Sequence, residues 1–329
     1  MSSENQDQAQ VRHSTSSVGV SADAVKAASE DALPVVDCAD DSQVTSDSGS
    51  GCENDSHVIS AADGESITGR NIHYGRIVSF SRRGSRLGDK YRDLMEQYRE
   101  QFVIDYPAGA AVAAIAPDAQ IDLSAQFGTQ APMIIEVGPG SGEQLISAAQ
   151  QHPEWNFLGL EAWGPGVARC VSAIVRAGVS NVRMMELDAA QGLPVLFGAH
   201  QRAPRPQVAQ VWTFFPDPWR KKRHHKRRIV NPEFARTVHH VLAEGGSWRL
   251  ATDWSNYAWH MRDVVEEAPG FVNPYAGQNP DPADEGRYRG GFAPRWDGRV
   301  MTRFEQRGLE AGRRIFDIHV VAQHVSDGE

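Results

Sequence analysis

Cysteine is scarce in this 329-residue chain, which contains only three. Cys38 and Cys52 lie in the first 70 residues, and Cys170 lies in a predicted helix. An odd number of cysteines without a C-x-x-C pair provides neither a disulfide framework nor a thiolate zinc site, and it fits a reducing cytoplasm. The 12 histidines are scattered and no H-E-x-x-H sequence occurs, so we expect no metal site.

Long hydrophobic runs are also missing. No stretch of about 18 apolar residues occurs, so the sequence predicts no membrane-spanning helix and no membrane partner. The first residues lack the basic and apolar regions that are typical of a secretory signal. We therefore expect a cytoplasmic protein.

The acidic excess of the chain, 42 Asp/Glu against 33 Lys/Arg, is concentrated near the N-terminus. Residues 1–70 hold 13 acidic and 3 basic side chains, together with many Ser, Gln and Gly and almost no aromatic residues. Such a segment offers little apolar surface to offset the entropy of ordering. It is predicted to be an acidic disordered tail, either a plain linker or a shield for a basic patch. Residues 71–329 are predicted to form one domain with a basic and helical N-terminal extension.

Short apolar runs alternate with amphipathic stretches from about residue 133 onward. Strands are predicted over 133–137, 156–161, 181–188, 208–216, 245–253 and 313–323. The stretch 231–242 predicts a helix with Asn231 as its N-cap and Pro232 in its first turn. The alternation of strands and helices predicts an α/β fold, a doubly wound and mostly parallel sheet with helices on both faces. A Pro- and Gly-rich stretch, 269–297, predicts a functional or poorly ordered loop.

A glycine-rich sequence, E-V-G-P-G-S-G-E, links the first predicted strand to a helix. Gly138, Gly140 and Gly142 allow the backbone to approach a ligand closely and direct helix N-terminal amides at it. The dehydrogenase fingerprint is G-x-G-x-x-G, and here the third glycine comes one residue early. The loop alone also suits a tight turn without any ligand.

Three acidic residues accompany this loop. Glu136 lies in the first predicted strand, Glu161 ends the second and Asp188 ends the third. We expect all three at the carboxyl edge of the sheet, where ligands of doubly wound folds bind. An acid after the second strand can accept hydrogen bonds from ribose hydroxyls, and one after the third can accept from an adenine amine. The extra acid Glu136 suits the ammonium group of S-adenosylmethionine, so the pattern favours this cofactor over NAD.

Asp217 lies between two prolines and among aromatic residues in F-F-P-D-P-W, residues 214–219. It follows the fourth predicted strand, so it is expected at the same edge as the acids. The prolines restrict the backbone, and a carboxylate beside aromatic rings suits a flat, polar base. A Pro-Asp-Pro turn with a buried tryptophan explains these residues equally well.

A cationic run fills the next nine positions, 220–228, with seven Lys/Arg and two His. Runs of this kind are usually solvated faces. This one contains no acid, follows the predicted base pocket directly and ends at a helix start. It can bind phosphates through counterion release and position a nucleic acid without reading its sequence.

Several motifs resemble those of the bacterial tRNA (guanine-N7-)-methyltransferase family. They are F-F-P-D-P-W followed by K-R-R-I-V, A-T-D-W at 251–254 and T-R-F-E-Q-R-G at 302–308. The sequence S-F-S-R-R-G-S-R-L at 79–87 is similar to the N-terminal motif of that family. The likeness extends over about residues 71–320. It implies the seven-stranded, Rossmann-like class I methyltransferase fold, S-adenosylmethionine as methyl donor, and methylation of N7 of guanine 46 in the tRNA variable loop.

The resemblance also implies the roles of individual residues. Asp217 would be catalytic. The cofactor would contact Glu136, Gly138, Gly140, Glu161, Asp188 and Asp217. The substrate would contact Lys221, Asp253, Thr302, Arg303, Phe304 and Glu305. The RNA would contact Arg223, His224, His225, Lys226, Arg227 and Arg228. The chain departs from the family pattern at Pro139, at Arg303 and at Val300-Met301.

Three other interpretations stay open. One is a non-catalytic RNA-binding protein on the same fold, against which the three strand-end acids argue. A second is a methyltransferase that acts on another atom or another RNA. Amino-group methylases usually carry a second proline after the Asn/Asp-Pro pair, and Asp217-Pro218-Trp219 lacks it. The third, a NAD-dependent dehydrogenase, leaves the cationic run unexplained.

Overall fold

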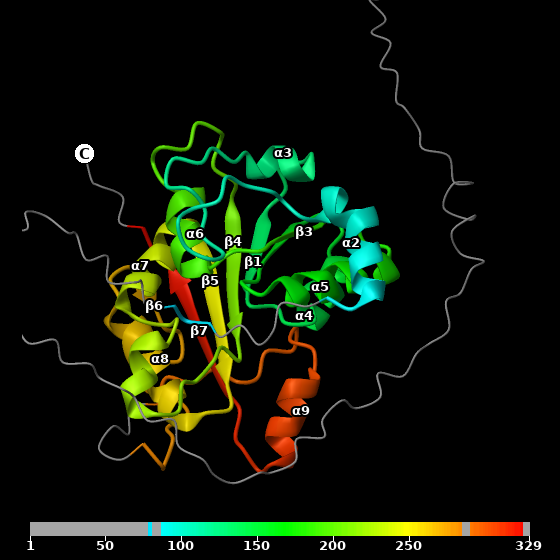
Figure 1. Cartoon of the computed structure of the whole chain (residues 1–329). Coiled ribbons are helices and arrows are strands. Elements are labelled where there is room, and N and C mark those ends of the chain that lie inside the picture. Colours follow the sequence, from blue (N-terminus) through cyan, green and yellow to red (C-terminus); the bar gives the residue numbers. More distant parts are fainter. Residues whose placement is uncertain (1–77, 81–86, 285–289, 325–329) are drawn as a thin grey trace, which may run out of the picture. The chain divides into compact units, whose positions relative to one another are not determined.

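A computed structural model of the chain describes residues 78–80, 87–284 and 290–324 (Figure 1). All of them belong to one compact unit, Ile72–Glu329. The predicted acidic tail and residues 81–86 of the N-terminal motif lie outside the described residues, so the predicted domain division stays a prediction. No helix in the described ranges is long and apolar enough to cross a membrane.

Within the described residues, seven strands form one sheet in the order β3–β2–β1–β4–β5–β7–β6. The strands are β1 (Met133–Val137), β2 (Asn156–Leu160), β3 (Val182–Met185), β4 (Val208–Phe214), β5 (Leu242–Thr252), β6 (Phe271–Val272) and β7 (Phe316–Ala322). The first five are parallel, whereas β7 runs antiparallel to β5 and to β6. The chain winds outward from β1 in one direction and from β4 in the other. The predicted doubly wound, mostly parallel sheet of the class I methyltransferase type is confirmed.

Helices cover both faces of this sheet (Figure 1). One face carries α2 (Asp89–Phe102), α4 (Glu143–Gln151) and α5 (Gly164–Ala177). The other carries α3 (Leu123–Phe127), α6 (Ala189–Leu196), α7 (Pro232–Val241) and α8 (Ser255–Glu267). The last helix of the described residues, α9 (Arg303–Glu310), precedes β7.

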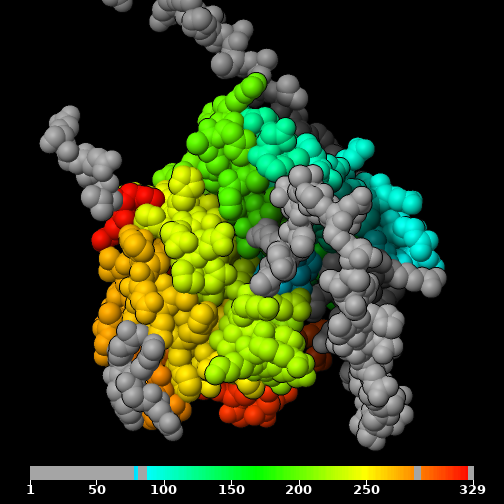
Figure 2. Space-filling view, turned by 60° about the vertical axis from the view of Figure 1, so that its left-hand side comes forward, coloured from blue at the N-terminus to red at the C-terminus, as the bar shows by residue number. Residues whose placement is uncertain are grey.

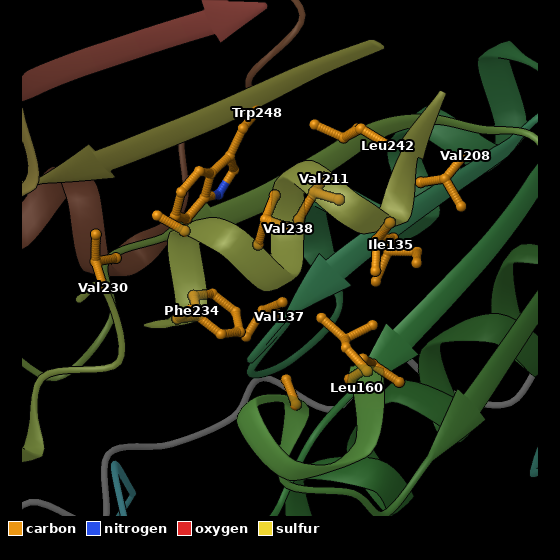
Figure 3. Packing of buried hydrophobic residues seen from close by; sticks show 14 of the residues in the cluster. Ile135, Val137, Leu160, Val208, Val211, Val230, Phe234, Val238, Leu242 and Trp248 are labelled. Carbon is orange, nitrogen blue, oxygen red and sulfur yellow. The ribbon is translucent and has the colours of Figure 1, made fainter. Parts of the chain in front are cut away.

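Each face has its own hydrophobic cluster, because side chains of the buried strands alternate between the two faces. Figure 3 shows Phe234 and Val238 of α7 among Ile135 and Val137 of β1 and Trp248 of β5. The rings of Phe234 and Trp248 meet edge to face at 5.8 Å. This packing fixes α7, and therefore the segment before it, relative to the ends of the strands.

Local sequence signals account for the ends of several helices. The Asn231 side chain accepts from the backbone N–H groups of Glu233 (3.1 Å) and Phe234 (3.0 Å), which confirms the predicted N-cap. Helix α5 ends at Gly178, whose φ of 66° is left-handed.

The structure differs from the sequence prediction after β3. The strand ends at Met185 rather than at 188, and Asp188 instead caps α6, which the sequence did not predict. Gly192 and Pro194 lower the helix propensity of this segment, which explains why its pattern was missed.

The Pro- and Gly-rich stretch 269–297 contains β6, a two-residue strand that the sequence did not predict. Its described parts are tied to α8. The Trp259 indole donates to Asp281 at 2.8 Å, and Arg262 donates to Asp284 at 2.7 Å. The described parts of this stretch therefore pack against α8.

Candidate active site at the carboxyl edge of the sheet

The glycine loop between β1 and α4 has a backbone that only glycine adopts easily. Gly138, Gly140 and Gly142 have φ angles of 71°, 61° and 80°. A Cβ built on Gly138 or Gly140 would meet no atom within 4 Å. Open space therefore lies against this loop, as a ligand that approaches the backbone requires.

Glu136 is buried in β1 just before the loop, with 4% of its surface exposed. Its Oε2 has no hydrogen-bond partner among the described residues. Burial raises the pKa of this carboxyl to about 8, and an N–H of Leu145 opposes the shift. A buried acid with an unsatisfied oxygen is stabilised in its charged form by a cationic group.

Glu161 follows β2 and is held by the loops around it. It accepts from the backbone N–H of Trp163 at 3.0 Å. Burial raises its pKa, backbone N–H groups of Trp163, Gly140 and Ala162 oppose the shift, and the charge of Asp217 adds to it. Glu161 therefore lies between the glycine loop and the segment after β4.

Asp188 is buried at the start of α6, where its carboxylate accepts from the N–H of Ala190 at 3.1 Å. Its own N–H donates to the carbonyl of Ala113 at 2.7 Å. The acid thus lies at the predicted edge but reaches it as a helix cap, three residues beyond the end of β3.

Asp217 lies in a strained, exposed loop that begins where β4 ends. The residues on either side of the Pro-Asp-Pro sequence, Phe215 and Trp219, have left-handed φ angles of 50° and 44°. Non-glycine residues adopt this region at a cost, and such strain gathers at functional sites. The N–H of Phe215 donates to the carbonyl of Ala251 in β5 at 2.8 Å, which fixes the start of the loop.

Arg228 anchors the other end of this loop. It is 3% exposed, and it donates to the carbonyl of Pro218 at 3.0 Å and to the Asn256 side chain at 2.8 Å. Its guanidinium also lies 4.6 Å from the centre of the Tyr257 ring. We therefore correct the predicted RNA contact at Arg228: its charge faces the protein interior and shapes the Asp217 loop.

Six residues of the cationic run form a short 3-10 helix, η1 (Lys222–Arg227). The Arg227 guanidinium stacks 3.6 Å from the Trp219 ring centre and donates to the carbonyls of Val78 and Phe80. The exposed side chains of the run are those of Arg220, Lys221, Lys222, Arg223 and Lys226. Desolvation, followed by the charge of Arg223, lowers the pKa of His224, and desolvation, followed by Arg228, lowers that of His225.

The predicted substrate residues 302–305 divide into two kinds. Thr302 caps α9 by accepting from the N–H of Glu305 at 3.2 Å, and Glu305 is fully buried. Arg303 and Phe304 are exposed, and the Phe304 ring lies 5.3 Å from the ring of Phe215. Figure 2 shows the yellow-green segment after β4 on the surface above the orange-red segment that contains α9. Helix α9 therefore borders the Asp217 loop.

Asp253, the other predicted substrate residue, accepts from Arg313 at 2.7 Å. It follows β5, next in the sheet to β4, and so lies at the same edge as Asp217. The described residues contain no group of three or more His, Cys, Asp or Glu that could hold a metal ion.

Comparison with known proteins decides the family. A family model described as "Putative methyltransferase" matches residues 130–318. A tRNA (guanine-N(7)-)-methyltransferase of Arthrobacter sp. (strain FB24) is 39% identical over 279 residues, which cover 74% of this chain and 86% of that protein. One of Cutibacterium acnes is 41% identical over 260 residues, or 79% and 88% of the two chains. The chain belongs to the tRNA (guanine-N(7)-)-methyltransferase family.

Sequence reasoning missed two residues that shape the site of this methyltransferase. Gln144 of α4 is buried and holds the segment 298–300, since it donates to the carbonyl of Gly298 at 2.9 Å and accepts from the N–H of Val300 at 2.8 Å. Arg299 is 2% exposed and forms an ion pair with Glu305 at 2.7 Å. Neither residue belongs to a recognisable motif. The partners of Gln144 are distant in the sequence, and the partner of Arg299, Glu305, lies inside α9, beyond its N-cap.

Proposed function

We propose that this methyltransferase transfers a methyl group from S-adenosylmethionine to N7 of guanine 46 in the variable loop of tRNA, in the cytoplasm. The observation that carries the proposal is the position of Asp217. It lies in a strained loop between the strand-end acids and the cationic run, where methyl donor and RNA base have to meet. The names of the relatives support tRNA and guanine N7 as the substrate and the atom.

The residues at the cofactor side fit S-adenosylmethionine, which supplies an electrophilic methyl group on a sulfonium sulfur. Glu161 would accept from the ribose hydroxyls, and Asp188 from the adenine amine. Glu136, with its unsatisfied buried oxygen, suits the ammonium group. The open space over Gly138 and Gly140 lets the backbone approach the same molecule.

The substrate side is proposed to hold the guanine between aromatic rings and a carboxylate. Phe215 and Phe304 offer adjacent faces, and Phe304 is 52% exposed. Asp217 accepts from guanine N–H groups, with Asp253 as a second polar contact. Thr302 and Glu305 keep α9, and with it Arg303 and Phe304, in place.

The reaction needs alignment more than proton transfer. Guanine N7 carries an in-plane lone pair and no proton, so no general base is required. Its lone pair would form the new N–C bond as the S–CH3 bond breaks, and the sulfur would keep the electron pair of the broken bond. Holding the two reactants in line accounts for much of the rate. The guanine ring gains positive charge, which the Asp217 carboxylate stabilises electrostatically.

The exposed part of the cationic run is proposed to bind the tRNA backbone. Lys221, Arg223 and Lys226 point to solvent and can neutralise phosphates. His224, His225 and Arg227 complete the contact surface. Of these, Arg227 would have to exchange its carbonyl partners for RNA, or bind the RNA while it keeps them.

The test is methyl transfer from labelled S-adenosylmethionine to unmodified tRNA transcripts that carry guanine or adenine at position 46. We expect label only in the guanine transcript, released by N7-specific depurination. Label that persists with adenine would keep the methyltransferase and reject the target position. Cofactor binding without label in any tRNA would favour another acceptor or an RNA-binding protein.

A further inference from the structure

Three parts of the site meet at Arg299. Its guanidinium donates to both carboxylate oxygens of Asp317 in β7, at 3.1 and 2.8 Å. It pairs with Glu305 of α9 at 2.7 Å. It also lies 5.3 Å from the centre of the Phe215 ring, in the strained loop that leads to Asp217. One side chain thus touches the sheet, the last helix and the Asp217 loop.

This arrangement is costly as a stabilising device. The side chains of Arg299 and Glu305 are each 1% exposed, and that of Asp317 is 8% exposed. Burial raises the pKa of Asp317, and the charge of Arg299 only partly opposes the shift. Because the desolvation of buried ion pairs can exceed their attraction, apolar residues of similar volume often stabilise a protein as well or better. The same cluster contains a fourth charged group, Arg295, which is 38% exposed and donates to the two oxygens of Glu305 at 2.9 and 3.2 Å.

Arg299 acts on both sides of the proposed guanine pocket. Together with Arg295 it holds Glu305, and thereby the first turn of α9, which carries Phe304. Its flat guanidinium also packs on Phe215, the partner of Phe304 and a residue with a left-handed backbone. A lysine keeps the charge but has neither the flat face nor the fork that spans two carboxylates.

We propose that Arg299 is a positioning residue for methyl transfer, which fixes the spacing between Phe304 and the Asp217 loop by holding Glu305, Asp317 and Phe215 together. The inference rests on the proposed function. Within the described residues, the interactions of Arg299 involve neither the proposed cofactor acids nor the cationic run. Its loss should therefore reduce turnover while leaving the binding of S-adenosylmethionine and tRNA nearly unchanged.

The chain offers a matched control in Arg262. This arginine is fully buried, pairs with Asp284 at 2.7 Å and Asp263 at 2.9 Å, and lies 5.4 Å from the Phe292 ring centre. It has the same chemistry as Arg299, but its partners lie in α8 and the stretch 281–292. Arg262→Lys reports what the loss of such a network costs the fold alone.

The experiment compares wild-type protein, Arg299→Lys and Arg262→Lys. Melting temperature, the Kd for S-adenosylmethionine, and kcat and KM on guanine-46 tRNA are measured, with assays well below both melting temperatures. We expect both variants to melt earlier. Only Arg299→Lys should lose kcat, by about tenfold or more, since misplacement by about 1 Å can cost about a hundredfold in rate. Both binding constants should stay within about twofold.

The outcomes separate the inference from the function. Wild-type kcat in Arg299→Lys, or an equal loss in Arg262→Lys, would overturn the positioning role. A wild-type protein that methylates no tRNA would overturn the proposed function and this inference with it. Should Arg299→Lys fail to fold, Asp317→Asn, which loosens one partner of the same guanidinium, must show the selective loss of kcat.

Discussion

Glu136 and Asp217 lie at the same edge of the sheet, one inside β1 and the other beyond the end of β4. Glu136 is 4% exposed and has an unsatisfied oxygen, whereas Asp217 is exposed in a strained loop. The proposed cofactor side therefore holds a desolvated acid, whose charged form a cationic ligand would stabilise. The proposed substrate side holds an exposed acid. Burial separates the two roles, although both use a carboxylate.

The two sides are also linked electrostatically. The charge of Asp217 contributes to the raised pKa of Glu161, so the Asp217 loop and the proposed ribose acid influence one another. Changes on one side should still have separate readouts. Loss of a cofactor acid should weaken binding of the methyl donor, and loss of Asp217 should mainly slow turnover.

The largest expected effect follows from Asp217→Asn. The amide keeps the shape but removes the charge that stabilises the developing positive ring. We expect kcat on guanine-46 tRNA to fall by about a hundredfold or more, measured under saturating methyl donor. Asp93→Asn, an exposed aspartate in α2, serves as the control. Wild-type turnover in Asp217→Asn would reject the catalytic role.

The next effect in size is on the cofactor side. Glu161→Gln removes a charged acceptor for the ribose hydroxyls. Because hydrogen bonds to a charged group contribute about 1.5–3 kcal/mol, the Kd for S-adenosylmethionine should rise by about 10- to 100-fold in calorimetry. Glu154 is exposed just before β2 begins, at the opposite end of the strand from Glu161. Glu154→Gln should therefore bind S-adenosylmethionine as the wild type does. An unchanged Kd in Glu161→Gln would exclude Glu161 from the cofactor site.

The sequence was sufficient to predict most of this edge, and the reasons are local. Parallel strands end at one edge, so Glu136, Glu161 and Asp217 could be grouped from the spacing of apolar runs alone. The sequence of a cationic run does not show which of its side chains face the solvent. The burial of Arg228 could therefore not be predicted. The T-x-x-E spacing of Thr302 and Glu305 is a capping-box signal. It was interpreted as a substrate motif, and the partner Arg299 became visible only in three dimensions.

A third prediction uses pH to sharpen the comparison. The pKa of Glu136 is about 8 in the folded protein against an ordinary value of 4.5. Between these two pH values the folded state keeps a proton that the unfolded state has lost. The contribution of Glu136 to stability without cofactor should therefore be largest below about pH 4.5 and be lost as the pH rises to about 8. Glu136→Gln removes this dependence, so it should unfold with more free energy than the wild type at pH 8, by up to a few kcal/mol.

The readout for Glu136 is denaturant unfolding of both proteins at pH 5 and pH 8. The advantage of Glu136→Gln should be larger at pH 8. Equal differences at the two pH values would show that Glu136 is not protonated in the folded protein. Binding of S-adenosylmethionine to the wild type at pH 7 should also release protons. Calorimetry in buffers of different ionisation enthalpy detects this release, because an ammonium group beside Glu136 lowers its pKa.

The smallest expected effect concerns the exposed lysines and arginines of the cationic run. Lys222 is exposed in η1 and forms no ion pair within the described residues. We expect it to contribute a phosphate contact that salt can screen. Lys222→Ala should weaken tRNA binding by about two- to tenfold and reduce the slope of log K against log salt by about 1. Lys90→Ala, an exposed lysine in α2, should change neither value. An unchanged slope in Lys222→Ala would place the RNA elsewhere. The cationic run would then serve mainly through its buried member, Arg228, as the support of the Asp217 loop.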